Sequence, residues 1–381
     1  MAKLESNSNP FPILGQTDTR TDASADALDL FGPKEPAALR GIAKIAATSP
    51  VVDQGHRVDF HALEVRSILN RTKSRRGFTF ARSINPYRGC EFACQYCYAR
   101  YTHEFMELRD PHAFESQIYI KQHAAWLLQQ ELGHLGPEEA IAIGTATDPY
   151  QPIERTARIT RSLLEVLCQQ RGRHIGIVTK STLIARDIDL LQRIHANNRL
   201  TLNITITTMD ANMARSLEPR APRPDLRMAT VTRLRKAGLR AGVLCCPLLP
   251  GITDTYAAIE SVASAASKAG AIFFHANPLF LKPCSKHVFE EYVQQHFPEL
   301  LGAYQARYEK SAFVSGAYRK RIAQMVEAIQ QKYRLGWRYE EVATQPRQHF
   351  RKAQMELFNE PTSMQPKTTR PNVSRRSSLS A

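Results

Sequence analysis

The sequence lacks any apolar run that approaches the roughly 20 residues needed to cross a bilayer, and its first residues contain no apolar stretch of the secretory type. We therefore expect no membrane partner and a cytoplasmic location. The chain is also poor in acidic residues relative to basic ones, with 36 Asp and Glu against 51 Lys and Arg in 381 residues. Its 43% of hydrophobic and 23% of charged residues are near globular averages, which excludes a largely disordered or collagen-like chain.

The excess of basic residues lies mainly in the body of the chain. Residues 1–40 have a net charge of −2 and residues 346–381 a net charge of +5, so +12 of the total +15 remains for residues 41–345. A basic body favours a polyanionic partner such as DNA or RNA. The charge fits an ordinary basic cytoplasmic protein equally well.

The seven cysteines do not predict a disulfide framework. Their number is odd, and a chain without an export signal is expected to remain in a reducing compartment. Cys168, Cys245, Cys246 and Cys284 are scattered among largely apolar neighbours, so we expect them to be buried as small hydrophobic side chains.

Composition divides the chain into five parts. The first and last are rich in polar residues without apolar periodicity, so we expect both to be disordered. The predicted parts are a disordered N-terminal arm at 1–40, an N-terminal extension at 41–79, a core barrel at 80–300, a C-terminal helical extension at 301–345 and a basic, mostly disordered tail at 346–381.

Short β-branched runs alternate with helical patterns in the core. The predicted strands are 82–84, 140–144, 174–179, 200–207, 241–246 and 271–275. The predicted helices are 158–170, 184–196, 226–237 with Gly238 after its end, and a fourth that is capped by Thr253 or Asp254 and ends near Gly270. Apolar strands separated by helices imply a parallel sheet covered by helices. Six such units predict an α/β fold, a partial (β/α)6 barrel with its site where the strands end.

Three closely spaced cysteines predict a metal centre. Cys90, Cys94 and Cys97 lie on one short segment, where a disulfide would be strained but three soft ligands can bind metal. Zinc would take His103 as a fourth ligand, whereas an iron–sulfur cluster would keep one iron open. The spacing favours the cluster, because structural zinc sites usually pair two short hooks and no second hook is present.

The same segment resembles a known family. Cys-x3-Cys-x2-Cys followed by an aromatic residue, after the first strand of a β/α repeat, is similar to the motif of the radical S-adenosylmethionine superfamily. The strings at 85–90, 97–100, 147–152 and 218–220 resemble the spore photoproduct lyase-like branch. This resemblance covers roughly residues 80–300.

The resemblance implies a [4Fe-4S] cluster on Cys90, Cys94 and Cys97, with S-adenosylmethionine chelating the fourth iron. A one-electron reductant of flavodoxin or ferredoxin type would then give a 5′-deoxyadenosyl radical that abstracts hydrogen from a substrate. The basic body and the lyase resemblance favour a nucleic-acid substrate. A protein-modifying radical enzyme and a zinc-stabilised nucleic-acid-binding protein without catalysis are the alternatives.

Further cofactor contacts follow from the resemblance and from the ends of the predicted strands. Gly144, Thr147 and Asp148 occupy the place of the small segment that meets the methionine amino group. Asp148 alternatively caps a helix. Lys180 follows the next strand and lies on the expected catalytic rim.

Two more predicted contacts lie further along the chain. Asn203 and Thr205 share one face of a strand and suit the ribose hydroxyls. Alternatively, they are an interior polar pair whose hydrogen bonds are satisfied within the structure. Arg220 could bind the methionine carboxylate with two hydrogen bonds.

Two tyrosines flank the third cysteine. In the lyase branch such tyrosines imply a relay of hydrogen or electrons, so Tyr96 and Tyr98 are candidate catalytic residues. They alternatively shield the cluster from water and tune its potential. Residues 143–150 contain no cysteine, whereas the lyase has its hydrogen donor there, so thymine-dimer repair is not implied.

Overall fold

A computed structural model describes residues 39–54, 57–71, 81–136 and 139–336. The described residues all belong to one compact unit. The expected disordered arm and tail lie outside the described residues, apart from residues 39 and 40. Among the helices described, none is long and apolar enough to cross a membrane.

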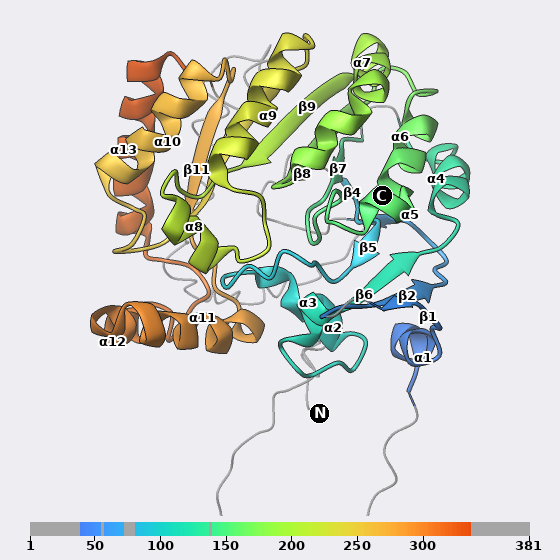
Figure 1. Ribbon diagram of the computed structural model, residues 1–381, viewed down its shortest axis with the longest axis horizontal. Coiled ribbons are helices and arrows are strands. Elements are labelled where there is room, and N and C mark those ends of the chain that lie inside the picture. Colours follow the sequence, from blue (N-terminus) through green and yellow to red (C-terminus); the bar gives the residue numbers. More distant parts are fainter. Residues whose placement is uncertain (1–38, 55–56, 72–80, 137–138, 337–381) are drawn as a thin grey trace, which may run out of the picture. The chain divides into compact units, whose positions relative to one another are not determined.

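The larger sheet forms the core and has the strand order β11-β10-β9-β8-β7-β4-β3. Its strands are β3 Leu69–Arg71, β4 Arg82–Ile84, β7 Ile141–Ile143, β8 His174–Thr179, β9 Arg199–Thr205, β10 Ala241–Leu248 and β11 Phe274–Pro278. The six strands from β4 to β11 are parallel to their neighbours, and β3 pairs antiparallel with β4. This arrangement confirms the predicted α/β fold and the partial (β/α)6 barrel (Figure 1).

Helices cover the outer face of this sheet. They are α4 Ala124–Leu132, α6 Ile159–Leu167, α7 Ile188–Asn197, α9 Pro224–Lys236, α10 Tyr256–Lys268 and α13 Gly316–Tyr333. In β9, Leu202 and Ile204 point into the main core under these helices, while Asn203 and Thr205 lie on the opposite, inner face. The alternation therefore places polar side chains inside the barrel, as predicted.

The start of α10 differs from the prediction. Its N-cap is Thr255, whose Oγ1 accepts a hydrogen bond from Ala258 N at 3.2 Å. The predicted caps serve the preceding turn instead: Thr253 Oγ1 accepts from Leu249 N, and the Asp254 carboxylate accepts from a neighbouring backbone amide. Their side chains are therefore unavailable to the helix.

The last strand begins later than predicted. The predicted strand was 271–275, but β11 begins at Phe274. Ala271 N donates to Ala266 O at 3.0 Å, after Gly270 with φ +77°. Ala271 therefore belongs to the C-terminal turn of α10.

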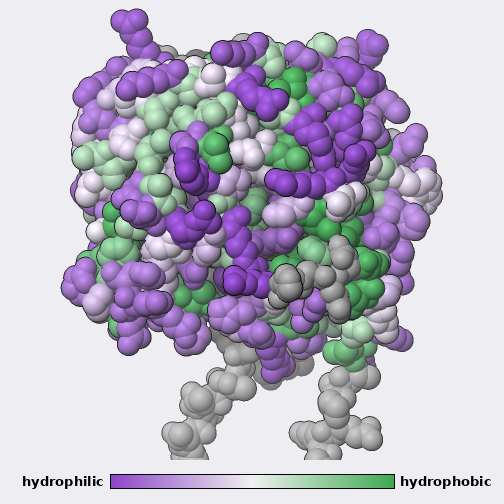
Figure 2. Space-filling model, in the orientation of Figure 1, coloured by the Kyte–Doolittle hydropathy of each residue, from purple (hydrophilic) through white to green (hydrophobic). Residues whose placement is uncertain are grey.

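A second sheet of four strands, in the order β1-β2-β6-β5, was not predicted. Its strands are β1 Val51–Gln54, β2 Asp59–Leu63, β5 Tyr87–Arg88 and β6 Gln117–Lys121. Phe60, Tyr87, Ile118 and Ile120 form a small core on one of its faces. Figure 2 shows hydrophobic residues gathered at the lower right, where β1, β2 and α1 (Gly41–Ala47) lie in Figure 1.

The remaining helices are short or lie near the end of the described chain. They are α2 Tyr101–Glu104, α3 Ala113–Ser116, α5 Glu154–Ala157, α8 Ala211–Leu217, α11 Pro283–His296 and α12 Leu301–Arg307, with 3-10 turns at Tyr98–Arg100, Thr182–Asp187 and Pro298–Leu300. In the segment 301–345, which was expected to be a helical extension, α13 packs against the barrel. Its Gln330 Nε2 donates to Phe274 O of β11 at 2.7 Å.

Candidate functional site

The three clustered cysteines lie on the loop that joins β5 to the turn at Tyr98–Arg100, which we call the cysteine loop (residues 89–97). Cys90 and Cys94 are buried and Cys97 is half-buried, and all three are free thiols. The expected burial of the other four cysteines is correct only for Cys245. The others, Cys168, Cys246 and Cys284, are half-buried.

The cysteine loop begins at a glycine that no other residue can replace without movement of the backbone. Gly89 has φ +82°, and a Cβ there would lie 2.8 Å from Gln117 O and 2.9 Å from Phe114 O. Next to it, Cys90 N donates to Phe114 O at 2.9 Å. The loop is therefore pressed against α3 and β6.

A buried glutamine fixes the backbone on both sides of Cys90. Gln151 Oε1 accepts from Glu91 N at 2.9 Å, and Gln151 Nε2 donates to Gly89 O at 3.3 Å. Glu91 in turn accepts from Ile153 N at 2.8 Å. The string at 147–152 had been singled out by the resemblance, but sequence reasoning missed this contact between its glutamine and the cysteine loop.

The segment after β7 is also fixed by residues that precede the cysteine loop. Asn85 Oδ1 accepts from Ala146 N at 2.8 Å and from Thr147 N at 3.4 Å. Thr147 is buried and its Oγ1 donates to Tyr87 O at 3.3 Å. The hydroxyl of Thr147, which was predicted to contact the cofactor, is therefore engaged in a hydrogen bond within the protein.

Gly144 permits the close approach of β7 and β8 at this point. Its φ is +85°, and a Cβ would lie 2.4 Å from Val178 O and 2.6 Å from Pro149 Cδ. The predicted need for a small residue at the end of this strand thus has a steric cause in the protein itself.

Asp148 connects the ends of these two strands. Its carboxylate accepts from Thr179 Oγ1 at 2.6 Å, from Lys180 N at 2.7 Å and from Tyr150 N at 2.9 Å. Burial raises the pKa of Asp148 above its usual value, although these hydrogen bonds oppose the shift. The alternative that Asp148 caps a helix is wrong, because α5 begins only at Glu154, with Ile153 as its N-cap.

A fully buried carboxylate lies beside the cysteine loop. Glu218 accepts hydrogen bonds from Tyr96 OH and from Thr207 Oγ1, the latter at 2.9 Å. Arg227 Nη1 lies 2.6 Å from Glu218 Oε2, and Lys180 Nζ lies 4.0 Å from Glu218 Oε1. We call Lys180, Glu218 and Arg227 the buried charge cluster.

Burial would raise the pKa of Glu218, but Arg227 and Lys180 hold it below its usual range. Arg227 is itself 1% exposed and donates to Thr205 O at 3.1 Å and to Pro222 O at 2.6 Å. The carboxylate is therefore ionised and well partnered. In the string at 218–220, sequence reasoning selected Arg220 as the functional residue and missed Glu218. The sequence does show Glu218 and Arg227 close together, but not that they pair.

Electrostatic contacts link this cluster to the cysteines. Burial raises the pKa of the Cys94 thiol to about 12, and Lys180 is the strongest influence that lowers it. Burial also raises the pKa values of Cys90 and Cys97, with Asp148 raising the first further and Arg100 lowering the second. The free thiols are therefore protonated at neutral pH, so metal binding has to displace protons.

The two tyrosines of the loop differ in their surroundings. Tyr96 is buried and bonded to Glu218 and Thr207. Tyr98 is 38% exposed and donates to Thr145 O, after β7. Tyr96 thus fits the shielding role, and Tyr98 lies closer to solvent at the rim.

Asn203 and Thr205 lie on the inner face of the barrel and are buried. Asn203 Nδ2 donates to Ile177 O at 2.9 Å, but its Oδ1 has no partner. The alternative, structural satisfaction of this polar pair, is met only in part for Asn203, because its Nδ2 is bonded to backbone carbonyls while its Oδ1 is not bonded. A buried acceptor without a donor suits a ligand hydroxyl.

Arg220 also contacts the cysteine loop. Its Nη1 donates to Glu115 O at 3.2 Å, and its backbone N donates to Phe92 O at 3.4 Å. The structure therefore places it against the loop, but with one guanidinium nitrogen already engaged.

The zinc alternative gains no support from the arrangement of side chains. His103 Nε2 lies 3.0 Å from Gln117 O, and its ring packs edge-on against Phe114 and Tyr119. Over the residues that the structure describes, no three or more His, Cys, Asp or Glu side chains surround a common ion position. Cysteines that each bind a different iron of a cluster do not need such a position.

The donor chemistry of the site fits both groups that the sequence resemblance implies. Cys90, Cys94 and Cys97 are three soft ligands on one loop, held at their backbone and free of disulfides. The unpartnered Oδ1 of Asn203 supplies an acceptor inside the barrel for a hydroxyl-bearing cofactor.

Known proteins resemble this chain in sequence. The model of the Radical SAM superfamily matches residues 84–261. Uncharacterized protein Rv2578c of Mycobacterium tuberculosis is 30% identical over 305 residues, which cover 80% of this chain and 89% of that protein. Uncharacterized protein MJ0683 of Methanocaldococcus jannaschii is 26% identical over 249 residues, which cover 65% and 86%.

Solved structures of spore photoproduct lyase resemble this chain in fold. A variant with bound AdoMet and dinucleoside spore photoproduct has a TM-score of 0.51 and 16% identity, and the match covers 78% of this chain and 84% of that one. A further structure, complexed with dinucleoside spore photoproduct, has a TM-score of 0.50 and 13% identity, with 72% and 79% covered. The matching family model, together with the relative that is 30% identical over 80% of this chain, shows that this chain belongs to the radical SAM superfamily.

Proposed function

We propose that this protein is a radical enzyme that binds a [4Fe-4S] cluster through Cys90, Cys94 and Cys97 and uses S-adenosylmethionine. The observation that carries the proposal is the rigid cysteine loop: three free thiols at the mouth of the barrel, fixed by Gln151 and Gly89. When bound and reduced by one electron from a flavodoxin- or ferredoxin-type donor, this pair of groups supplies a 5′-deoxyadenosyl radical that removes hydrogen from a substrate.

The chain's own residues would bind and orient S-adenosylmethionine in the barrel. Asn203 Oδ1 would accept from a ribose hydroxyl, and Lys180, which follows β8 and packs over the Tyr96 ring, would attract the carboxylate. The backbone at Gly144 would face the methionine amino group. Buried Tyr96 would exclude water from the cluster side of the site.

Arg220 is proposed as a second cation for the methionine carboxylate. Arg220→Ala should weaken S-adenosylmethionine binding, because a lost charge-assisted hydrogen bond costs roughly 1.5–3 kcal/mol, about one to two decades in affinity. Equilibrium binding to the iron-loaded protein measures this. An unchanged affinity would assign Arg220 only to the contact with Glu115.

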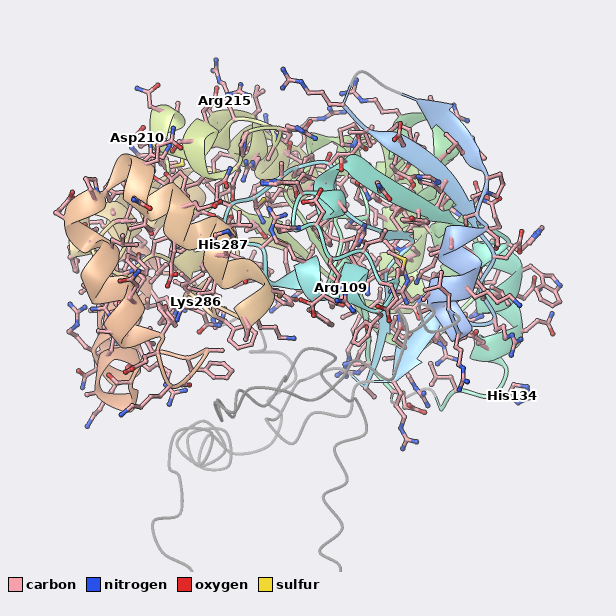
Figure 3. The ribbon with its side chains drawn as sticks, turned by 90° about the horizontal axis from the view of Figure 1, so that it is seen from below. Arg109, His134, Asp210, Arg215, Lys286 and His287 are labelled. Carbon is pink, nitrogen blue, oxygen red and sulfur yellow. The ribbon has the colours of Figure 1, made fainter. Side chains whose placement is uncertain are left out.

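A nucleic acid is the proposed substrate class. Aromatic and basic side chains meet at the rim: Tyr98 and Phe105 are exposed, and Lys282 Nζ lies 3.6 Å from the centroid of the Tyr101 ring. Figure 3 shows the basic side chain of Arg109 on the face seen from below. Stacking surfaces with cations are typical of single-stranded nucleic-acid sites, and the bound dinucleoside in the lyase structures is consistent with this class.

The activity is tested by anaerobic reconstitution with iron and sulfide, followed by reduction in the presence of S-adenosylmethionine. We expect about four irons per chain and formation of 5′-deoxyadenosine and methionine. Replacement of Cys90, Cys94 or Cys97 by Ala should abolish both, whereas the matched control Cys168→Ala should retain both. A fully loaded, reduced protein that never cleaves S-adenosylmethionine would disprove the proposal.

The substrate class is tested by the salt dependence of binding to DNA and RNA oligonucleotides. The logarithm of the affinity should fall with the logarithm of the salt concentration by about 0.7–0.9 for each phosphate neutralised. A chain ending at residue 345 lacks the basic tail and should still bind. Loss of binding in that shorter chain would remove the charge argument for a nucleic-acid substrate.

A further inference from the structure

The buried charge cluster has more cations than anions beside the cysteine loop. Lys180 and Arg227 both contact Glu218, and the side chains of Glu218 and Arg227 are only 1% exposed. With all three ionised, the cluster has a net charge of +1. Such a charge is only weakly screened by solvent.

Lys180 and Glu218 both contact Tyr96 of the cysteine loop. Lys180 Nζ lies 5.7 Å from the centroid of the Tyr96 ring, between two of the cysteines in sequence. Only 18% of the Lys180 side chain is exposed. Glu218 accepts a hydrogen bond from the hydroxyl of the same tyrosine, so both charges lie against the loop.

Radical formation, as proposed above, requires a cluster that accepts one electron and so becomes more negative. A fixed cation nearby stabilises the reduced form and raises the midpoint potential, while a fixed anion lowers it. We propose that Lys180 and Glu218 set the reduction potential of the cluster through opposing charges, with Lys180 raising it and Glu218 lowering it. The effect of Lys180 on the reduction potential is independent of any contact that Lys180 makes with S-adenosylmethionine, so it can be measured without the cofactor.

Potentiometric titration of the iron-loaded protein, without S-adenosylmethionine, tests the proposal. Lys180→Met keeps the length of the side chain but removes its charge, and should lower the midpoint potential. We expect at least a tenfold change in the ratio of reduced to oxidised cluster at a fixed applied potential, which is 59 mV for one electron. Lys180→Arg keeps the charge and should stay near the wild-type potential.

Glu218→Gln should shift the potential in the opposite direction, since it removes the anion. The matched control is Glu260→Gln, the same chemical change in α10, where Glu260 pairs with Lys332 of α13. This control should leave the potential unchanged. If Glu218→Gln does not take up iron, the comparison of Lys180→Met with Lys180→Arg decides the matter alone.

The outcomes separate this inference from the proposed function on which it rests. Opposite shifts for Lys180→Met and Glu218→Gln support it, because a general loss of structure has no reason to change sign with the charge removed. Unchanged potentials, or equal shifts for Lys180→Met and Lys180→Arg, overturn it while the cluster assignment stands. Failure of the wild-type protein to bind a cluster overturns both.

Discussion

Two largely buried lysines of this protein have pKa values that are shifted in opposite directions. Burial, with Arg88 nearby, lowers the pKa of Lys121 in β6 to about 7. Burial alone would also lower the pKa of Lys180, but Cys94 and Glu218 raise it above its ordinary value. Lys180 therefore stays charged at neutral pH, whereas Lys121 is close to neutrality.

The difference lies in the partners that each region offers. Lys180 has a buried carboxylate within 4.0 Å. Around Lys121, Glu131 opposes the shift, but Arg88 is nearby, and Arg88 Nε and both ring nitrogens of His61 are buried without hydrogen-bond partners. The buried charge cluster, in which the cations are paired with a carboxylate, thus lies beside the cysteine loop. Its charges there would affect the properties of a metal centre.

The largest expected effect on stability comes from removing the carboxylate of the buried charge cluster. Glu218→Ala would leave Arg227 and Lys180 as buried cations without their carboxylate, which should cost about 3–5 kcal/mol of the free energy of unfolding. Urea denaturation measures this. Glu260→Ala, which removes a carboxylate from the outer pair with Lys332, should cost much less. Equal losses would contradict the importance of the buried position.

The next effect concerns Lys121, whose pKa is lowered by burial. Because the folded-state pKa of Lys121 lies near 7 and the ordinary pKa of a lysine is 10.5, the unfolded chain binds more protons between these values. Stability should therefore rise with pH between about 7 and 10, by about 1 kcal/mol per pH unit from this group. Lys121→Met should remove that part of the slope, as measured by denaturation at several pH values. A slope identical to that of the wild type would show that Lys121 stays charged.

A smaller effect is expected for the tyrosine that contacts the buried charge cluster. Tyr96→Phe deletes a hydroxyl that donates to Glu218 and leaves a buried carboxylate short of one donor. The free energy of unfolding should fall by roughly 1–3 kcal/mol. Thermal or chemical denaturation of the metal-free protein checks this, and no loss at all would mean that water replaces the hydroxyl.

The smallest effect is expected for the neighbouring tyrosine. Tyr98→Phe removes a single hydrogen bond to Thr145 O from a residue that is 38% exposed, so the loss should be about 1 kcal/mol or less. The same denaturation experiment applies. A loss larger than that of Tyr96→Phe would reverse the contrast between the two sides of the loop.

Periodicity and spacing predicted the barrel because its strands are short, apolar and regularly separated by helices. β8 agrees with its predicted bounds, and β4 with the predicted 82–84. The small sheet could not be predicted in this way, because β2 pairs with β6 across a long stretch of sequence and β5 has only two residues. Pairings between distant segments leave no local pattern.

The candidate site shows the same division. The three cysteines were visible as a motif, and Gly144 was expected from the need for a small residue. Gln151 and Glu218 were missed because their roles depend on contacts with the cysteine loop, more than 50 residues away in sequence. A glutamine or glutamate in a motif indicates importance, but only the fold identifies its partner.

The central claim is that the cysteine loop holds a cluster with one iron open to S-adenosylmethionine. The electron paramagnetic resonance spectrum of the reduced, iron-loaded protein tests this most directly when recorded with and without S-adenosylmethionine. The account predicts a cluster signal whose g values change when the cofactor is added, because the cofactor binds the open iron. A cluster signal that is identical with and without saturating S-adenosylmethionine, or no cluster signal in the loaded and reduced protein, would contradict it.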